Sequence, residues 1–164
     1  MIDTEPQGPS KEELKALLRA AWALVRLETP SLSCYVGEND QLERAAAFRL
    51  GHHLENLVAV QRLQWAGRFR SCVVDMELTR ISGGDQKMGR GQSADAVIHV
   101  RGHDDGNLLA LEVKPSATGE NDTKDLAKLT DLVKDPRRYS HGVRAVLDLR
   151  EMKLEFSDWI GGRM

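Results

Sequence analysis

Two apolar segments separated by a short polar turn constrain the fold of this chain more than any other feature. In residues 94–100, apolar side chains at every second position alternate with Asp95, Val97 and His99, and residues 107–114 return as a second apolar run. The turn between them reads HDDGN, and aspartate, glycine and asparagine are residues that a β-hairpin favours. The pattern therefore predicts two neighbouring antiparallel strands.

Three further elements are predicted on the N-terminal side of the hairpin. A capping box at Ser10 opens a helix whose apolar residues recur at helical spacing up to the region of Pro30. The same capping-box spacing at Asp40 opens a second helix that runs to about Val60. Residues 71–79 alternate as a strand, so three strands should follow one another as a meander.

Beyond the hairpin the pattern returns to a helix and then to a strand. The helix is predicted to begin at Asp122, to carry Leu126, Leu129 and Val133 at helical spacing, and to end before the next proline. A last apolar strand follows at residues 143–149. Two strands joined by a crossover helix pair in parallel, so we expect an α/β fold with a mixed sheet covered by helices.

Length and composition indicate a single domain. A chain of 164 residues can bury a core without disulfides, and we expect residues 1–39 to form a helical extension packed on a domain of residues 40–164. Cys34 and Cys72 fit no metal-ligand spacing, so both should be thiols in a reducing compartment. The N-terminus lacks the order of a signal peptide, and no apolar run approaches a membrane span, so we expect a soluble, cytoplasmic protein.

The charge balance leaves any binding of nucleic acid to local patches. A formal net charge of −2 gives no global attraction for a polyanion. Residues 62–101, however, contain seven basic and four acidic side chains. Three of these cations, Arg80, Lys87 and Arg90, lie in or just before a glycine-rich stretch, and they could contact phosphates from a loop. A solvated surface loop explains them equally well.

Three charged residues of the hairpin are the main candidates for a catalytic metal site. Glu112 and Lys114 lie two positions apart on a strand, so both side chains leave one face while apolar residues fill the other. Asp95 stands at the start of the neighbouring strand, where the hairpin can bring it beside Glu112. Two adjacent carboxylates repel unless a cation lies between them, and such oxygen ligands suit Mg²⁺ or Mn²⁺. The structural alternative is a buried ion pair inside the sheet.

The segment SADAVIHVRGHDDGNLLALEVKPS, residues 93–116, resembles the signature of the PD-(D/E)XK, or restriction-endonuclease-like, nuclease superfamily. The segments ERAAAFRLGHHL, VDMELTR, ADAVIHVRG and NLLALEVK, with the later pair Lys128-Leu129, are also similar to a prokaryotic family of such nuclease-like proteins. The resemblance spans roughly residues 43–149. It implies a core of helix, three-strand meander, helix and strand, with a mixed sheet flanked by helices.

The resemblance also implies roles for individual residues. Asp95 takes the aspartate position of the motif, Glu112 the second acidic position and Lys114 the lysine position. One departure is Ala94, which stands where the superfamily has a proline. That proline shapes the entry to the strand and does no chemistry, so the departure leaves the three charged positions intact.

Glu43 is a fourth candidate for the site. It falls in the apolar stripe of the second helix, a position that a charged side chain occupies only for a reason. The capping box with Asp40 supplies one reason, because Glu43 would then satisfy a backbone N–H at the helix start. The resemblance supplies another, in which a glutamate of this helix joins the metal site directly or through water. Weaker candidates for accessory contacts are Asp75, Glu77, Lys124 and Lys128.

These observations predict a metal-dependent nuclease that cuts DNA with Mg²⁺ or Mn²⁺, as a homodimer or with a recruiting protein partner. The cation would be held by Asp95, Glu112 and Glu43, with Lys114 beside it. One alternative is a catalytically silent module that keeps the fold and binds nucleic acid or a protein partner, and another is an acidic metal-binding regulator. The histidines form no ligand set, and the three tryptophans are expected to anchor a core or an interface rather than stack bases.

Overall fold

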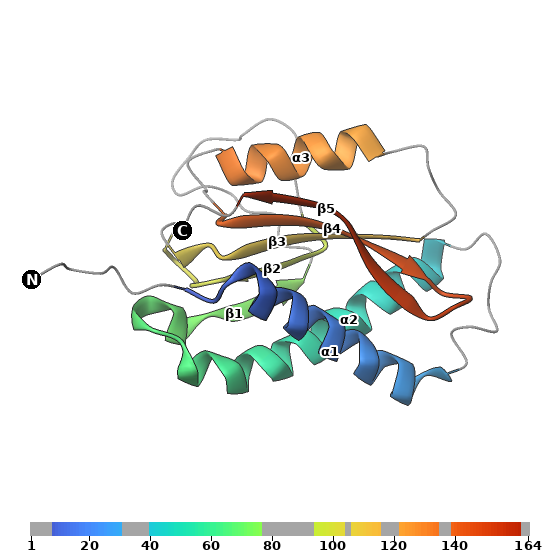
Figure 1. The fold of residues 1–164 in the computed structure, drawn as a ribbon, viewed down its shortest axis with the longest axis horizontal. Helices are drawn as coiled ribbons and strands as arrows, with labels where there is room; N and C mark the ends of the chain where they lie inside the picture. The colour runs from blue at the N-terminus through green and yellow to red at the C-terminus, as the bar shows by residue number, and fades with distance from the viewer. Residues whose placement is uncertain are drawn as a thin grey trace, which may run out of the picture.

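The computed structural model of the chain describes residues 8–30, 40–76, 94–103, 106–115, 122–134 and 139–161. The helices are α1 (Lys11–Glu28), α2 (Asp40–Gln61) and α3 (Asp122–Lys134), with short 3-10 turns η2 (Arg62–Gln64) and η3 (Gly67–Ser71) after α2. The strands are β1 (Val73–Met76), β2 (Ala96–His99), β3 (Leu109–Pro115), β4 (His141–Asp148) and β5 (Lys153–Gly161). Together they form an α/β fold with an open, mixed, five-stranded sheet (Figure 1).

The strands lie in the order β1-β2-β3-β4-β5, which is also their order along the chain. β3 and β4 are parallel with α3 between them in sequence, whereas the other neighbouring pairs are antiparallel. The predicted hairpin, meander and parallel pair are therefore confirmed. β5 was not predicted, although Lys153 and Glu155 alternate there with Leu154 and Phe156 in the manner of an edge strand.

β5 contains an extra residue that changes the direction of its side chains. Arg144 of β4 pairs with Asp158, and the next residue, Ala145, pairs with Phe156, so Ser157 has no partner of its own. This β-bulge shifts the alternation of the strand by one position. Phe156 and Trp159 consequently lie on the same face, although three positions separate them, and both pack against the larger hydrophobic cluster.

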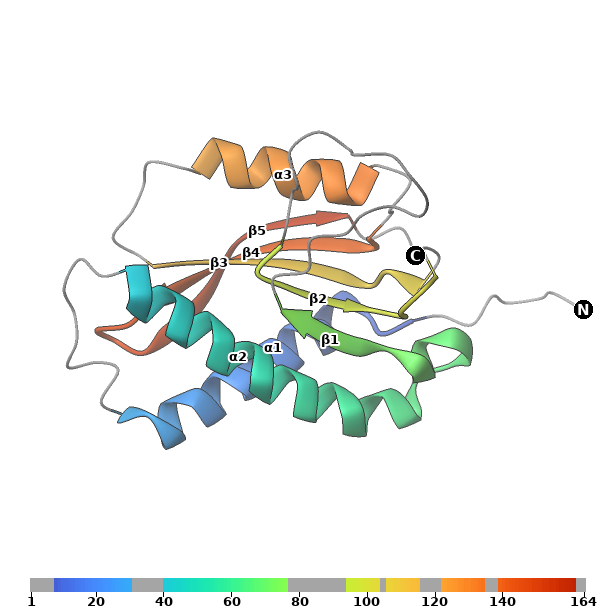
Figure 2. The same ribbon diagram turned by 180° about the vertical axis from the view of Figure 1, so that it is seen from behind.

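Helices cover both faces of the sheet (Figure 1 and Figure 2). α1 and α2 pack together on one face, where they form the larger hydrophobic cluster with Leu109, Leu111 and Val113 of β3. α3 covers the other face over a smaller cluster that contains Leu129. Each fully buried leucine contributes roughly 2 kcal/mol of burial free energy. The remaining side chains of β3 alternate towards α3.

The first two helices agree with their predicted bounds. The Ser10 hydroxyl accepts a hydrogen bond from the Glu13 N–H, and the Glu13 carboxylate accepts one of 2.7 Å from the Ser10 N–H, which completes the capping box. The buried residues of α1 are Leu14, Leu17, Leu18, Ala21, Trp22 and Val25. Among the described residues, no helix has the length and apolar character needed to cross a membrane.

α3 is rotated from the orientation that its apolar residues suggested. The predicted spacing grouped Leu126, Leu129 and Val133, but Leu126 is 37% exposed. The fully inward-facing side chains are instead Asp125, Leu129 and Leu132. Charged residues of β3 lie beneath this helix, and Asp125 turns inward to pair with one of them. The buried face of α3 therefore includes an acidic residue that the apolar pattern alone does not reveal.

Cysteine and tryptophan side chains occupy core positions where the structure describes them, with Trp159 half-buried at the edge of the core. Cys72 is a buried free thiol, and burial raises its pKa to about 11. Trp22 is buried, and its indole N–H donates a hydrogen bond of 2.9 Å to the Met152 carbonyl oxygen. Trp65 is buried as well. Cys34 lies outside the described residues.

Candidate active site

The strand register brings Asp95 beside Glu112. Ala96, the first residue of β2, pairs with Leu111 of β3, and one further step along the antiparallel register sets Asp95 opposite Glu112. The Asp95 Oδ2 atom accepts a hydrogen bond of 2.7 Å from the backbone N–H of Val113. This N–H lies beyond the end of β2, so the Asp95 side chain supplies the acceptor that a longer strand would have provided.

Glu112 is a buried carboxylate that pairs with a lysine of α3. Its side chain is 1% exposed, and Lys128 Nζ lies 2.6 Å from Glu112 Oε1. Burial raises the pKa of Glu112 to about 7, the negative charge of Asp95 adds to the rise, and Lys128 opposes it. Burial also raises the pKa of Asp95, against the hydrogen bond from Val113. At neutral pH, Glu112 is therefore close to the midpoint of its titration.

Lys114 pairs with the same helix one turn earlier. Its Nζ atom lies 3.6 Å from Asp125 Oδ2, and its side chain is 30% exposed. Asp125 is buried, and its charge contributes to the raised pKa values of Asp95 and Glu112. Three carboxylates and two ammonium groups thus meet between β2, β3 and α3. We call these residues the acid–lysine cluster: Asp95, Glu112, Lys114, Asp125 and Lys128.

Three of these residues could be grouped from the sequence, with Glu112 and Lys114 on β3 and Asp95 directly before β2, but the residues of α3 received little weight. From the sequence, Lys128 is only a weak candidate, and Asp125 is not predicted. A signal was present, because Asp125 precedes the buried Leu129 by four positions and Lys128 precedes the buried Leu132 by four. Both side chains therefore border the buried face of α3. Lys124, the other weak candidate on this helix, is exposed.

The donor atoms of the cluster suit a hard divalent cation. Asp95 and Glu112 offer carboxylate oxygens from adjacent strands, and Mg²⁺ is commonly held by one or two carboxylates together with water and a substrate phosphate. In the described part of the chain, no three His, Cys, Asp or Glu side chains are grouped so that they could hold a metal ion. Lys128 neutralises Glu112 in this arrangement, so a cation would compete with Lys128 for that carboxylate.

Other predicted site residues fall where the structure gives no account of their side chains. For Glu43, the backbone lies in the first turn of α2, and its side chain is not among those described. Glu77, Arg80, Lys87 and Arg90 lie outside the described residues. Their proposed contacts with metal or phosphate stay predictions.

Asp75 belongs to a separate ion-pair network on β1 and β2. His99 Nε2 lies 2.7 Å from Asp75 Oδ2, and Arg101 donates hydrogen bonds to both oxygens of the same carboxylate. The hydrogen bonds from Arg101 and His99 outweigh burial and lower the pKa of Asp75 to about 2. Its carboxylate is therefore ionised and engaged by two neighbours, and His99 is a buried histidine with a carboxylate partner.

Comparisons with protein-family models, with curated proteins and with solved structures give no match to the chain. Its own fold and site define an α/β protein with a mixed five-stranded sheet and a buried acid–lysine cluster beneath the crossover helix.

Proposed function

We propose that this protein is a metal-dependent nuclease of the restriction-endonuclease-like type, which hydrolyses phosphodiester bonds in DNA. The observation that carries the proposal is the juxtaposition of Asp95, directly before β2, with Glu112 of β3, and Lys114 on the same face of β3. The order α2, β1, β2, β3, α3, β4 agrees with the helix, three-strand meander, helix and strand of such a core. Both the donor chemistry and the topology therefore support this class.

The residues of the acid–lysine cluster have distinct roles in this proposal. Asp95 and Glu112 hold Mg²⁺ or Mn²⁺, which when bound supplies a water of lowered pKa and offsets charge on the phosphate. Lys114 orients the attacking water or contacts the phosphate as negative charge develops on it. Asp125 keeps the Lys114 ammonium group near the carboxylates. Lys128 favours the ionised form of Glu112, because its positive charge opposes the rise in the Glu112 pKa.

One observation favours a second candidate, a catalytically silent module that binds nucleic acid or a protein partner. Glu112 and Lys114 each have an oppositely charged partner on α3. Such pairs could serve only to fix α3 over the sheet, since removing one partner of a buried pair costs on the order of 3–5 kcal/mol. In that case no cation binds Asp95 and Glu112.

Cleavage of a mixed panel of DNA and RNA substrates, with Mg²⁺, Mn²⁺ or EDTA, tests the proposal. We expect cleavage with metal and none in EDTA. Lys114→Ala should cut the rate by roughly 10²-fold or more while cation binding survives, because Lys114 is assigned to the water or phosphate. Glu112→Gln should lose both cation binding and cleavage. Lys134→Ala removes an exposed lysine from the end of α3 and is the matched control.

The outcomes separate the two candidates. Full activity in Lys114→Ala would reject the mechanism, even if the wild type cleaves DNA. A wild-type protein that neither cleaves any substrate nor binds Mg²⁺ or Mn²⁺ in a calorimeter would favour the silent module.

Glu43→Gln tests the remaining ligand assignment. The glutamine amide can still take part in helix capping, so a capping role predicts near-normal cleavage. Membership of the metal site predicts weaker cation binding or slower cleavage, with the free energy of unfolding little changed. Calorimetry and cleavage rates on the same preparation distinguish these results.

A further inference from the structure

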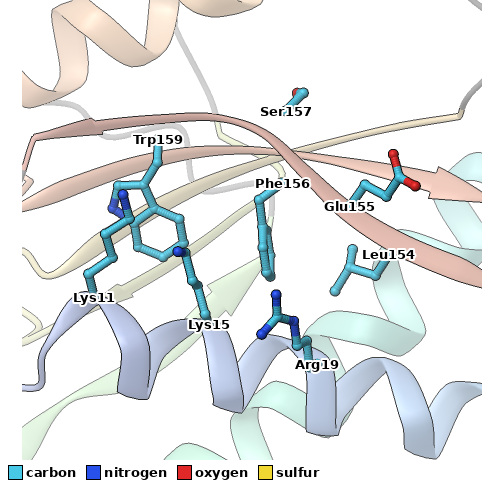
Figure 3. A pocket seen from close by; sticks show the side chains of 8 residues that line it. All are labelled: Lys11, Lys15, Arg19, Leu154, Glu155, Phe156, Ser157 and Trp159. Atoms are coloured by element: carbon cyan, nitrogen blue, oxygen red, sulfur yellow. The ribbon is translucent and has the colours of Figure 1, made fainter.

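A basic groove lies between α1 and β5, on the face of the sheet that is covered by α1 and α2 (Figure 3). Its volume is about 550 Å³, within the range of pockets that bind small molecules. The groove is distinct from the acid–lysine cluster, which lies on the face covered by α3. The residues that carry the argument are Lys11, Lys15 and Arg19 of α1 and Glu155, Phe156 and Trp159 of β5.

The three cations form a row because of the period of the helix. Lys11, Lys15 and Arg19 stand four positions apart, so their side chains follow one another along one flank of α1. At a rise of 1.5 Å per residue, the row extends over about 12 Å. That length exceeds a single phosphate group and suits a chain of negative charges.

Each cation lies over an aromatic ring of β5. The Nζ atoms of Lys11 and Lys15 lie 5.3 Å and 5.7 Å from the centroid of the Trp159 ring. The guanidinium carbon of Arg19 lies 5.4 Å from the centroid of the Phe156 ring. A cation–π contact contributes about 0.5–1 kcal/mol at exposed sites, which is enough to bias these long side chains towards the groove.

The aromatic floor of the groove is held in place by two features of β5. The bulge at Ser157 puts both rings on the same face, with their centroids 5.8 Å apart. The Trp159 indole N–H donates a hydrogen bond of 3.1 Å to His141 Nδ1. Burial lowers the pKa of His141, and the charge of Lys11 adds to this effect, so a neutral His141 accepts that bond.

Carboxylates near the row set its net charge. Glu12 accepts a hydrogen bond of 2.9 Å from Lys15 on the exposed surface of α1, and Glu155 lines the groove from β5. Three cations and these two carboxylates leave a formal charge of +1 at the groove. The groove therefore keeps a positive excess in a chain whose formal net charge is −2.

We propose that this groove binds the phosphate backbone of a single-stranded nucleic-acid segment and holds it away from the acid–lysine cluster. The choice of nucleic acid rests on the proposed nuclease function. Cationic side chains beside aromatic rings are the combination that single strands favour, because a cation that turns from its ring to a phosphate leaves the ring for a base to stack on. An acidic peptide would use the cations but gain nothing from the paired rings. Trp159 thus belongs to a site that sequence reasoning did not expect.

The test is the fluorescence anisotropy of a labelled oligothymidylate with the full chain in EDTA, where binding is measured without cleavage. The triple variant Lys11→Gln, Lys15→Gln, Arg19→Gln should weaken binding about tenfold or more and lower the salt slope by about 2, since each phosphate contact of a single strand contributes about 0.7. The matched control Arg26→Gln, Arg44→Gln, Arg49→Gln removes three exposed cations from α1 and α2 and should keep the slope.

Two further variants keep the result interpretable. Lys11→Arg with Lys15→Arg conserves the charges and should bind as the wild type, which shows that positive charge at these positions is what the oligonucleotide requires. Phe156→Leu removes one ring and should weaken oligothymidylate binding. Equal losses in the groove and control triple variants would overturn the proposal, as would displacement of the oligonucleotide by poly-glutamate as readily as by unlabelled oligothymidylate.

The same experiment separates this proposal from the nuclease assignment. Asp95→Asn changes the acid–lysine cluster alone and should bind the oligonucleotide as the wild type. Groove-dependent binding without metal-dependent cleavage would reject the nuclease and support the groove. Metal-dependent cleavage, together with oligonucleotide binding that the groove variants do not change, would support the nuclease and reject the groove.

Discussion

Replacement of Glu112 by glutamine should stabilise the protein at pH 8 and leave its stability unchanged near pH 4.5. The pKa of Glu112 rises from its ordinary value of 4.5 to about 7 in the folded protein, mainly through burial. Between these two values the folded state binds a proton that the unfolded chain has released. The stability contributed by the protonated group is therefore complete below pH 4.5 and is lost as the pH rises through 7.

The size of the effect follows from the difference between the two pKa values. At about 1.4 kcal/mol for each tenfold change in proton affinity, the wild type should lose about 2–3 kcal/mol between pH 4.5 and pH 8 through this group. Glutamine matches the protonated acid in shape and charge. The variant should therefore keep that stability at pH 8, even though Lys128 then has no carboxylate partner at position 112.

Urea denaturation in EDTA at several pH values measures this gain. Glu55→Gln removes an exposed carboxylate from α2 and should change the free energy of unfolding by less than about 0.5 kcal/mol at every pH. A Glu112→Gln protein that is less stable than the wild type at pH 8 would refute the reasoning. It would mean that the pair with Lys128 stabilises the fold by more than burial of the carboxylate costs.

Three further predictions concern metal, acid and packing. Mg²⁺ at a hundred times its Kd should stabilise the wild type by about 2.7 kcal/mol and raise its Tm. Asp95→Asn should abolish this rise in Tm, and an equal rise in Tm for the variant would place the cation elsewhere. Asp75→Asn should lower the free energy of unfolding by about 1–2 kcal/mol at pH 7, a value that is reduced because Arg101 is exposed. Since the Asp75 pKa is lowered from 3.8 to about 2, this stability is lost as the pH falls through 2, and the urea curves of the two proteins should converge there. Leu129→Ala should cost roughly 2–5 kcal/mol and Leu126→Ala less than about 1 kcal/mol, because only Leu129 is fully buried; equal losses would contradict the orientation of α3.

Local patterns in the sequence were sufficient for most of the fold. The turn HDDGN and the alternation around it specify the β2–β3 hairpin, and the capping box at Ser10 specifies the start of α1. These signals depend only on neighbouring residues. β5 was not predicted because its apolar side chains are only half-buried, so that its sequence looks like a polar segment with scattered apolar residues.

The residues of the candidate site also differ in whether local sequence patterns predict their positions. Asp95, Glu112 and Lys114 could be grouped from the sequence, since strand alternation and one hairpin fix their relative positions. Asp125 was missed, because its four-residue spacing from Leu129 indicates an inward position only once the rotation of α3 against β3 is known. The basic groove also depends on tertiary structure, because a single extra residue on β5 decides which rings face α1.

The bulge has a consequence for how separate copies of this chain meet. β1 and β5 are the outer strands of the described sheet, and the unpaired N–H and C=O groups of an outer strand can recruit a strand from another molecule. In the described part of the chain, β1 has four residues. β5 has nine, but its register with β4 shifts by one residue at Ser157, and the charged residues Glu155 and Asp158 flank that point. Ser157, the extra residue that puts both rings of β5 on the face of α1, therefore also disfavours edge-to-edge aggregation through β5.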